Sequence, residues 1–209
     1  MTKFLVVFDV DSTLIEQEAI ELLAAYSKSA DEVKEITDRA MRGEIDFNQS
    51  LIQRVATLKG LPESVLQAVS GQLSLTKGAK ELVAEIQRRD GKAACVSGGF
   101  IQLLDPLKAE LGLNYAAANT LGVEAGVLTG EVVGDIVNRQ AKADFLAAWA
   151  AENDLPLSKT IAVGDGANDL GMMAIAGLSV AFCAKPIVNQ QADIALRERD
   201  LSQLIELLP

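Results

Sequence analysis

Four short apolar segments recur along the chain, and each is followed at once by a turn rich in glycine or polar residues. Helical stretches separate these segments. Strands that alternate with helices in this way are typical of a doubly wound α/β fold, in which right-handed crossovers cover both faces of a parallel sheet. We therefore expect a Rossmann-like α/β core. The predicted strands are residues 4–8, 93–96, 161–163 and 179–182, and the predicted covering helices are residues 78–89, 100–111, 141–153 and 170–176.

A long helical stretch interrupts this alternation between the first and second predicted strands. Its helix start signals are the run from Ser29 to Glu32, the run from Asp46 to Gln49, and Pro62. Because the stretch begins directly after the first strand, we expect it to lie over the edge of the sheet as a lid. The predicted domains are an α/β core of residues 1–13 and 75–209 and an inserted helical cap of residues 14–74.

A second irregular segment, residues 119–135, has glycines spaced among valines and leucines. Glycines that punctuate such a pattern indicate tight turns between strands. We expect this segment to form a short β-hairpin flap.

The chain has a formal net charge of −10 and contains no histidine. The acidic balance argues against nucleic acid or an anionic membrane surface as a partner, since both bind a basic face. The lack of histidine removes the commonest general base, the serine triad and the usual zinc sites, so acid–base chemistry falls to carboxylates or lysine. Cys95 and Cys183 lie in apolar runs, and we expect buried thiols without a disulfide.

The N-terminus lacks the apolar region of a signal peptide, because Asp9 breaks its apolar run. No apolar stretch approaches the length needed to span a membrane. We therefore expect a cytoplasmic protein. Its expected partner is a small-molecule substrate, and its expected oligomeric state is a monomer or a homodimer.

The first predicted strand ends in two carboxylates, Asp9 and Asp11. The carboxyl edge of a parallel sheet is where such folds bind ligands, and strand residues two apart point to the same side. Two like charges held that close need a cation or a proton between them. The alternative interpretation is a capped helix start, with Asp11 or Ser12 as the N-cap and the other acid in solvent.

Three further segments carry candidate chemistry. Ser97, Gly98 and Gly99 precede a predicted helix, where backbone N–H groups favour an anion, although a plain tight turn has the same pattern.

Lys142 lies at a predicted helix start, which is an unfavourable end for a cation unless another group compensates for its charge. The alternative is a solvated lysine. The turn from Gly164 to Asp169 is rich in the oxygen ligands of a hard cation such as Mg²⁺, although an ordinary Asx-rich turn is similar.

These segments are expected to meet at one edge of the predicted sheet. A carboxylate nucleophile, a metal ion, a lysine and backbone donors together suit phosphoryl transfer, in which positioning and charge neutralisation supply most of the catalysis. The combination is far more specific than any one of its members.

The motifs that carry this chemistry resemble those of the haloacid dehalogenase superfamily. The runs FDVDST, VSGG, QAKADF and VGDGAND are similar to its four motifs, in the same order and over nearly the whole chain. Within that superfamily, the helical insertion resembles the phosphoserine phosphatases at Glu18, Met41, Phe47 and Arg54, and the runs GDGANDLGMM and AFCAKP do so as well.

The resemblance implies a Mg²⁺-dependent phosphomonoesterase that hydrolyses O-phospho-L-serine through an aspartyl-phosphate, the last step of serine biosynthesis. It implies Asp9 as the nucleophile and Asp11 as the general acid and base. The other implied roles are metal binding by Asp9, the Asp11 main-chain carbonyl and Asp165; support of the metal waters or of Lys142 by Asp169; phosphate binding by Ser97, Gly98, Lys142 and Asn168; recognition of the ammonium and carboxylate by Glu18 and Arg54; and apolar pocket walls from Met41 and Phe47.

Other interpretations of the same residues stay open. Glu18 and Arg54 also suit the solvated surface of a helix, and core packing explains Met41 and Phe47 equally well. One alternative function is a phosphatase or phosphotransferase that acts on another small phosphomonoester, such as phosphohomoserine, or that passes the phosphoryl group to an alcohol such as homoserine. The other alternative is a binding protein without catalysis that senses a phosphorylated metabolite.

Overall fold

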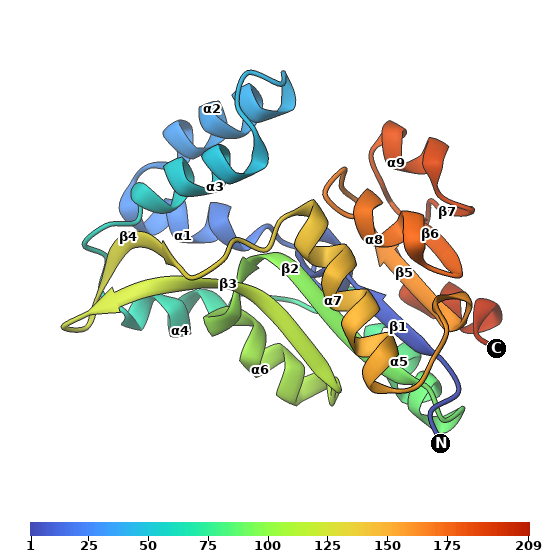
Figure 1. The fold of residues 1–209 in the computed structure, drawn as a ribbon. Helices are drawn as coiled ribbons and strands as arrows, with labels where there is room; N and C mark the ends of the chain where they lie inside the picture. The colour runs from blue at the N-terminus through green and yellow to red at the C-terminus, as the bar shows by residue number, and fades with distance from the viewer.

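A seven-stranded sheet in the order β4-β3-β2-β1-β5-β6-β7 forms the centre of the molecule (Figure 1). The computed structural model describes residues 1–209, except for the side chain of Met41. Neighbouring strands are parallel apart from the antiparallel pair β3 and β4. The predicted doubly wound α/β sheet is therefore confirmed. Its strands are β1 (Leu5–Phe8), β2 (Lys92–Phe100), β3 (Tyr115–Glu124), β4 (Val127–Val133), β5 (Thr160–Gly164), β6 (Leu178–Phe182) and β7 (Ile194–Leu196).

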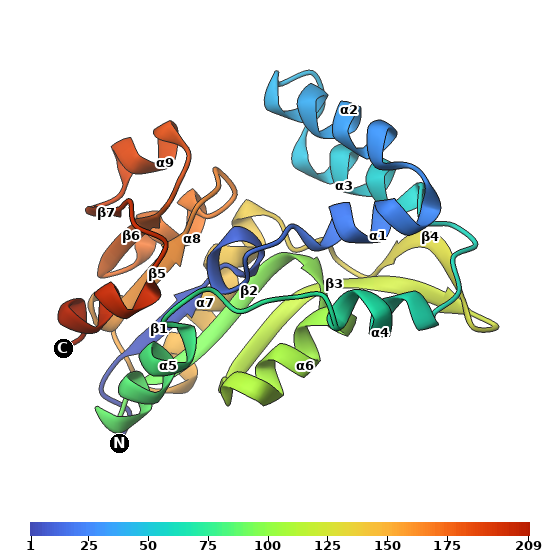
Figure 2. The same ribbon diagram turned by 180° about the vertical axis from the view of Figure 1, so that it is seen from behind.

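The apolar run of β1 is buried on both faces because β1 lies in the middle of the sheet, between β2 and β5. Successive side chains of a strand point to opposite faces. Val6 and Phe8 accordingly pack in one core with α5 (Ala79–Arg88) and α6 (Ile101–Leu111), which Figure 2 shows in front of the sheet. Leu5 and Val7 pack in a second core on the opposite face, together with Trp149. Two helix layers thus cover the sheet.

The helices fall near their predicted positions. The helix predicted at 141–153 begins two residues earlier, because the Asn138 side chain accepts hydrogen bonds from the N–H groups of Gln140 and Ala141 and so caps the helix there. The α-helices are α1 (Ala19–Ser27), α2 (Ala30–Met41), α3 (Phe47–Ala56), α4 (Ser64–Ser70), α5 (Ala79–Arg88), α6 (Ile101–Leu111), α7 (Arg139–Glu152), α8 (Leu170–Ile175) and α9 (Pro186–Gln191). The helical turns of other types are η1 (Val10–Leu14), η2 (Leu157–Lys159) and η3 (Leu201–Leu207).

Helices α1 to α4 all lie between β1 and β2 in the chain, and α2 and α3 stand apart from the sheet in Figures 1 and 2. The capping box predicted from Asp46 to Gln49 is present at the start of α3. Ser29 precedes α2 without capping it through its side chain, and α4 starts at Ser64, two residues past Pro62. The boundaries of a separate cap domain at residues 14 and 74 stay a prediction.

The predicted β-hairpin flap is present as β3 and β4, which are joined at Ala125 and Gly126. Both turn residues have positive φ, +50° and +78°, as tight hairpin turns require. The hairpin shares an apolar core with the inserted helices, through Leu121 and Leu128. The pattern did not predict the first half of β3, which is rich in alanine, or the three-residue β7.

Cys95 is buried, as predicted, and burial raises the pKa of its thiol to about 12. The prediction of a buried thiol is wrong for Cys183, which is partly exposed because it lies just past the end of β6 with a φ of +46°. Both thiols are free. Across the part of the chain that the structure describes, no helix has the length and apolarity needed to cross a membrane.

Candidate active site

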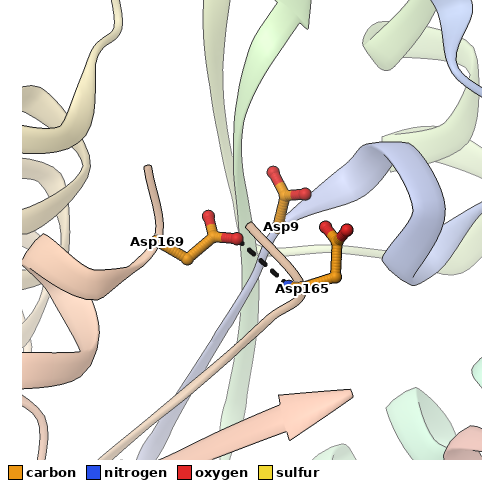
Figure 3. Close-up of side chains that lie close together, drawn as sticks. All are labelled: Asp9, Asp165 and Asp169. Carbon is orange, nitrogen blue, oxygen red and sulfur yellow. Dashed lines mark hydrogen bonds between the residues drawn. The ribbon is translucent and has the colours of Figure 1, made fainter. Parts of the chain in front are cut away.

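Three carboxylates meet at the carboxyl edge of the sheet (Figure 3). Asp9 follows β1 and Asp165 follows the adjacent strand β5, while Asp169 precedes α8. Each offers an oxygen within 4.8 Å of the others. Because parallel neighbours end at the same edge, residues separated by more than 150 positions in the chain become neighbours in space. An oxygen-only donor set of this kind suits a hard divalent cation.

Lys142 is the cation that this acidic cluster already contains. Its side chain is 0% exposed, and its Nζ donates hydrogen bonds to Asp9 Oδ1 at 2.5 Å and to Asp169 Oδ1 at 2.6 Å. Burial alone would lower the pKa of Lys142, but the carboxylates of Asp169 and Asp9 outweigh burial and raise it above its ordinary value. The alternative of a solvated lysine is therefore wrong, and the two carboxylates compensate for a cation in the first turn of α7.

Asp9 is 5% exposed, so the alternative in which one acid of the pair is left in solvent is wrong as well. Burial raises the pKa of Asp9 well above its ordinary value, and Asp169 adds to this rise against the opposing effect of Lys142. Burial also raises the pKa of Asp165 to about 6, again with a contribution from Asp169. One lysine does not balance this cluster of acids, which favours a further cation.

Asp169 organises the acidic turn from within. Its Oδ2 accepts hydrogen bonds from the N–H groups of Asp165 at 3.1 Å and Gly166 at 2.9 Å, while its Oδ1 binds Lys142. A Cβ at Gly164 would collide with the Asp169 carboxylate, and one at Gly166 would collide with the Asn168 side chain. Gly164 thus leaves room for the acid that holds the loop, and Gly166 leaves room for the side chain of Asn168.

Asp11 faces the same edge from the turn η1. Its Oδ1 accepts a hydrogen bond from the N–H of Ala19 at 2.7 Å, and its Oδ2 accepts one from Ser97 Oγ at 3.1 Å. Burial, followed by the nearby carboxylate of Glu18, raises the pKa of Asp11 to about 6. A carboxyl group with this pKa can give and take a proton near neutral pH.

Ser97, Gly98 and Gly99 lie within β2, which continues to Phe100 before α6 begins. These residues precede a helix, as predicted, since α6 begins at Ile101, but the alternative of a tight turn is wrong. The segment stays extended while its register with β3 shifts between Val96 and Phe100. Neither glycine has space for a Cβ, which would lie 2.9 Å from the Phe47 ring at Gly98 and 2.8 Å from the Asp11 carboxylate at Gly99. The extended backbone therefore approaches the site closely.

A cavity of about 830 Å³ opens over the carboxylates, between the inserted helices and the sheet edge. Arg54 lines it from α3, and burial lowers the pKa of its guanidinium against the attraction of Glu18 and Asp11. Glu18 also lines it, so neither residue belongs to a helix surface away from the site. The predicted residues that line the cavity are Asp9, Asp11, Glu18, Phe47, Arg54, Gly98, Asp165 and Asn168.

Three other predicted site residues are buried behind the residues that line the cavity, and a fourth has a side chain outside the described residues. Ser97 is buried behind Asp11, and Lys142 and Asp169 are buried beneath Asp9. The side chain of Met41 lies outside the described residues, so its predicted role stays a prediction.

Sequence reasoning missed two basic residues of the cavity wall, Arg139 and Lys185. Both are exposed. Lys185 follows β6, immediately before the proline that starts α9, and its N–H donates to the Asp165 carbonyl at 3.0 Å. A lysine between a strand end and such a proline is the signal that could have placed it at the sheet edge.

Residues 6–174 match the sequence family of haloacid dehalogenase-like hydrolases. The chain is 53% identical over 206 residues to the phosphoserine phosphatase of Streptococcus thermophilus, covering 99% of this chain and 96% of that protein. It is 43% identical to the phosphoserine phosphatase of Methanocaldococcus jannaschii, covering 99% and 98%. The phosphoserine phosphatase of Streptomyces coelicolor is 51% identical over 98% of this chain, which spans 50% of that longer protein.

Solved structures of phosphoserine phosphatases are similar to this chain as well. A substrate-bound phosphoserine phosphatase superimposes with a TM-score of 0.94 at 42% identity, and each chain is covered completely. A phospho-aspartyl intermediate analogue of phosphoserine phosphatase superimposes with the same score, identity and coverage.

Proposed function

Because this chain belongs to the haloacid dehalogenase-like hydrolases, we propose that it is a phosphoserine phosphatase that hydrolyses O-phospho-L-serine to L-serine and phosphate, the last step of serine biosynthesis. The observation that carries this proposal is the buried contact of Lys142 with Asp9 and Asp169, directly beneath a cavity that Glu18 and Arg54 line. In this contact Lys142 opposes the effect of burial on Asp9 and favours the ionised carboxylate that attack on phosphorus needs. The cavity adds one acidic and one basic group for the rest of an amino-acid substrate.

Asp9 is the proposed nucleophile. One of its carboxylate oxygens forms a bond to phosphorus while the bond from phosphorus to the serine oxygen breaks, which leaves an aspartyl-phosphate. Water then attacks the same phosphorus, the bond to Asp9 breaks, and phosphate departs. Two displacements of this kind are each easier than a single direct one. Lys142 holds Asp9 in place and offsets the charge of the transferred group.

Asp11 is the proposed general acid and base. In the first displacement its proton passes to the serine oxygen as that oxygen leaves, and in the second it takes a proton from the attacking water. The raised pKa of about 6 allows both forms at working pH. The hydrogen bonds from the Ala19 N–H and the Ser97 hydroxyl keep the Asp11 carboxyl turned toward the cavity.

The oxygen-rich edge fits Mg²⁺, and the groups that would hold it are the Asp9 carboxylate, the Asp11 main-chain carbonyl and Asp165. When bound, Mg²⁺ supplies positive charge that neutralises the phosphoryl oxygens. We assign Asp169 to a supporting role, because both of its oxygens are already engaged by Lys142 and by two backbone N–H groups. Ser97, the Gly98 N–H, Lys142 and Asn168 are the proposed partners of the phosphate.

We assign substrate recognition to residues of the inserted helical segment. The Glu18 carboxylate suits the ammonium of phosphoserine, and the Arg54 guanidinium suits its carboxylate. Phe47 supplies an apolar wall beside Gly98, and we propose Met41 for a second wall. The cytoplasmic location and the monomer or homodimer expected from the sequence stay predictions.

The test is phosphate release from a panel of phosphomonoesters that contains L-phosphoserine, phosphothreonine, phosphohomoserine and sugar phosphates, each with Mg²⁺ and with a chelator. The proposal predicts a strong preference for phosphoserine that the chelator abolishes. Another preferred ester, or phosphoryl transfer to added homoserine, would keep the chemistry and overturn the substrate. No turnover of any ester would favour a binding protein without catalysis.

A further inference from the structure

Ser12 adopts a backbone conformation that few serines adopt. It lies in η1, between Asp11 and the inserted helices, with φ +56° and ψ +6°. A residue with a Cβ in this left-handed region carries a conformational cost, which persists only where the surroundings impose it. Such strain next to an active site is a reason to ask what the side chain contacts.

Hydrogen bonds on both sides of Ser12 impose this conformation. The N–H of Ser12 donates to the carbonyl of Gln17 at 3.2 Å. The carbonyl of Ser12 accepts from Nη2 of Arg199, also at 3.2 Å, and the Arg199 guanidinium is itself paired with Glu16. Two segments far apart in the chain thus hold one strained serine in place.

The result of this conformation is that the Ser12 hydroxyl donates to Glu18 Oε1 at 2.7 Å. Among the hydrogen bonds and ion pairs of the described side chains, this is the one contact of the Glu18 carboxylate. Glu18 precedes α1 without capping it through its side chain, so the helix does not orient the carboxylate. The Ser12 hydroxyl is therefore the group that orients the Glu18 carboxylate.

We infer that Ser12 is a positioning residue for substrate specificity: its hydroxyl fixes the Glu18 carboxylate on the cavity wall and so selects phosphomonoesters that carry an amino group beside the ester. The inference rests on the proposed function, because it needs Glu18 to receive the substrate ammonium. One Glu18 oxygen is bound by Ser12, which leaves the other oxygen for the ammonium. A fixed acceptor loses less rotamer freedom on binding than a free one.

The experiment compares two substrates in variants of residue 12. They are O-phospho-L-serine and its analogue with hydrogen in place of the amino group, 3-phosphooxypropanoate, both with Mg²⁺. The ratio of their kcat/KM values cancels any damage to the shared phosphoryl chemistry. Ser12→Ala removes the hydroxyl, and Ser12→Gly removes it while it also relieves the positive-φ strain. Ser158→Ala, at an exposed serine, is the matched control.

We expect both Ser12 variants to lower the preference for phosphoserine by about threefold to tenfold, the effect of one hydrogen bond, and Ser158→Ala to leave it unchanged. Glu18→Gln should lower the preference at least as much. Adding Ser12→Ala to Glu18→Gln should lower it no further, since the two residues act as one unit. A role for Ser12 in folding alone would not move this ratio.

The two proposals fail in different ways. If Glu18→Gln lowers the preference but both Ser12 variants keep it, or if the double variant shows the product of the two single effects, the role of Ser12 is overturned and the proposed function stands. If Glu18→Gln keeps the preference, or the wild type shows none, the assignment of Glu18 and phosphoserine is overturned, and the inference about Ser12 falls with it.

Discussion

At the scale of single residues, the site depends on charges that would be costly if they were buried alone. Lys142 is fully buried and can stay charged because two carboxylates contact it. Asp9 and Asp169 are buried in turn and depend on Lys142. A change that neutralises one member therefore affects the others, and effects on activity and on stability must be measured separately.

Replacing Asp9 by asparagine should abolish turnover, by at least about a thousandfold, because an amide cannot form the aspartyl-phosphate. The shape of the side chain is kept, so the chain should still fold and still bind Mg²⁺ weakly through Asp165. Phosphate release, thermal unfolding and Mg²⁺ titration measure the three effects. Substantial residual turnover would place the nucleophile elsewhere.

Replacing Arg54 by alanine should weaken substrate binding more than it slows the chemistry. A charge-assisted hydrogen bond is worth about 1.5 to 3 kcal/mol, which corresponds to a rise in KM of about 10- to 150-fold. Steady-state kinetics with phosphoserine gives the KM and kcat values. Arg88→Ala is the control, since Arg88 pairs with Glu85 on the far helix α5. An unchanged KM in Arg54→Ala would contradict the assignment.

At the scale of secondary-structure elements, α7 connects the buried lysine to the rest of the fold. Asn138 caps this helix four residues before Lys142, and its Nδ2 also donates to Asn48 Oδ1 of α3 at 3.4 Å. The position of Lys142 thus depends on a cap residue that also contacts the inserted helices. The end of β2 plays a similar part, since it stays extended past Val96 and brings Gly98 and Gly99 to the cavity.

Asn138→Ala should lower the free energy of unfolding by about 0.5 to 2 kcal/mol, because two N–H groups of the first turn of α7 lose their acceptor. Asn138→Asp keeps an acceptor oxygen at the cap and should retain most of the stability. Urea denaturation of the two variants and the wild type measures the difference. Equal losses in both variants would show that the cap is not the cause.

At the scale of the whole molecule, the site exists because one sheet collects distant segments and one insertion covers them. The chain has a net charge of −10, and part of that negative charge is concentrated in the cavity. Burial of these acids without a bound cation must lower the stability of the fold at neutral pH. The stability of the molecule should therefore depend jointly on pH and on Mg²⁺.

Asp165 allows this dependence to be tested. Its pKa is raised from 3.8 to about 6, so between these values the folded state binds more protons than the unfolded state does. Stability from Asp165 is then complete below about pH 4 and is lost as the pH rises through about 6, by at most about 3 kcal/mol, since one pKa unit corresponds to about 1.4 kcal/mol.

The measurement is urea denaturation at several pH values with a chelator, for the wild type and for Asp165→Asn. The wild type should lose stability relative to the variant as the pH rises, because asparagine does not ionise. Added Mg²⁺ at neutral pH should restore stability to the wild type more than to the variant. Parallel pH profiles for the two proteins would contradict the raised pKa.

The sequence alone determined the features that local pattern encodes. The apolar run of β1, the helices that cover the sheet, the hairpin and the capping box follow from side-chain periodicity and turn chemistry within about ten residues. The order of the motifs along the chain was enough to predict one ligand-binding edge. It also identified Asp9, Asp11, Lys142 and Asp165, because each stands at or near the end of a strand or the start of a helix.

Only the tertiary structure decided how those residues meet. No local pattern shows that Lys142 is buried between Asp9 and Asp169, that Arg139 lines the cavity, or that Ser12 is held by Arg199 from the opposite end of the chain. The extended end of β2 and the strands β3 and β7 also depend on pairing with distant neighbours. The physical reason is that burial, hydrogen-bond partners and pKa are set by groups brought close in space, whereas periodicity records only neighbours along the chain.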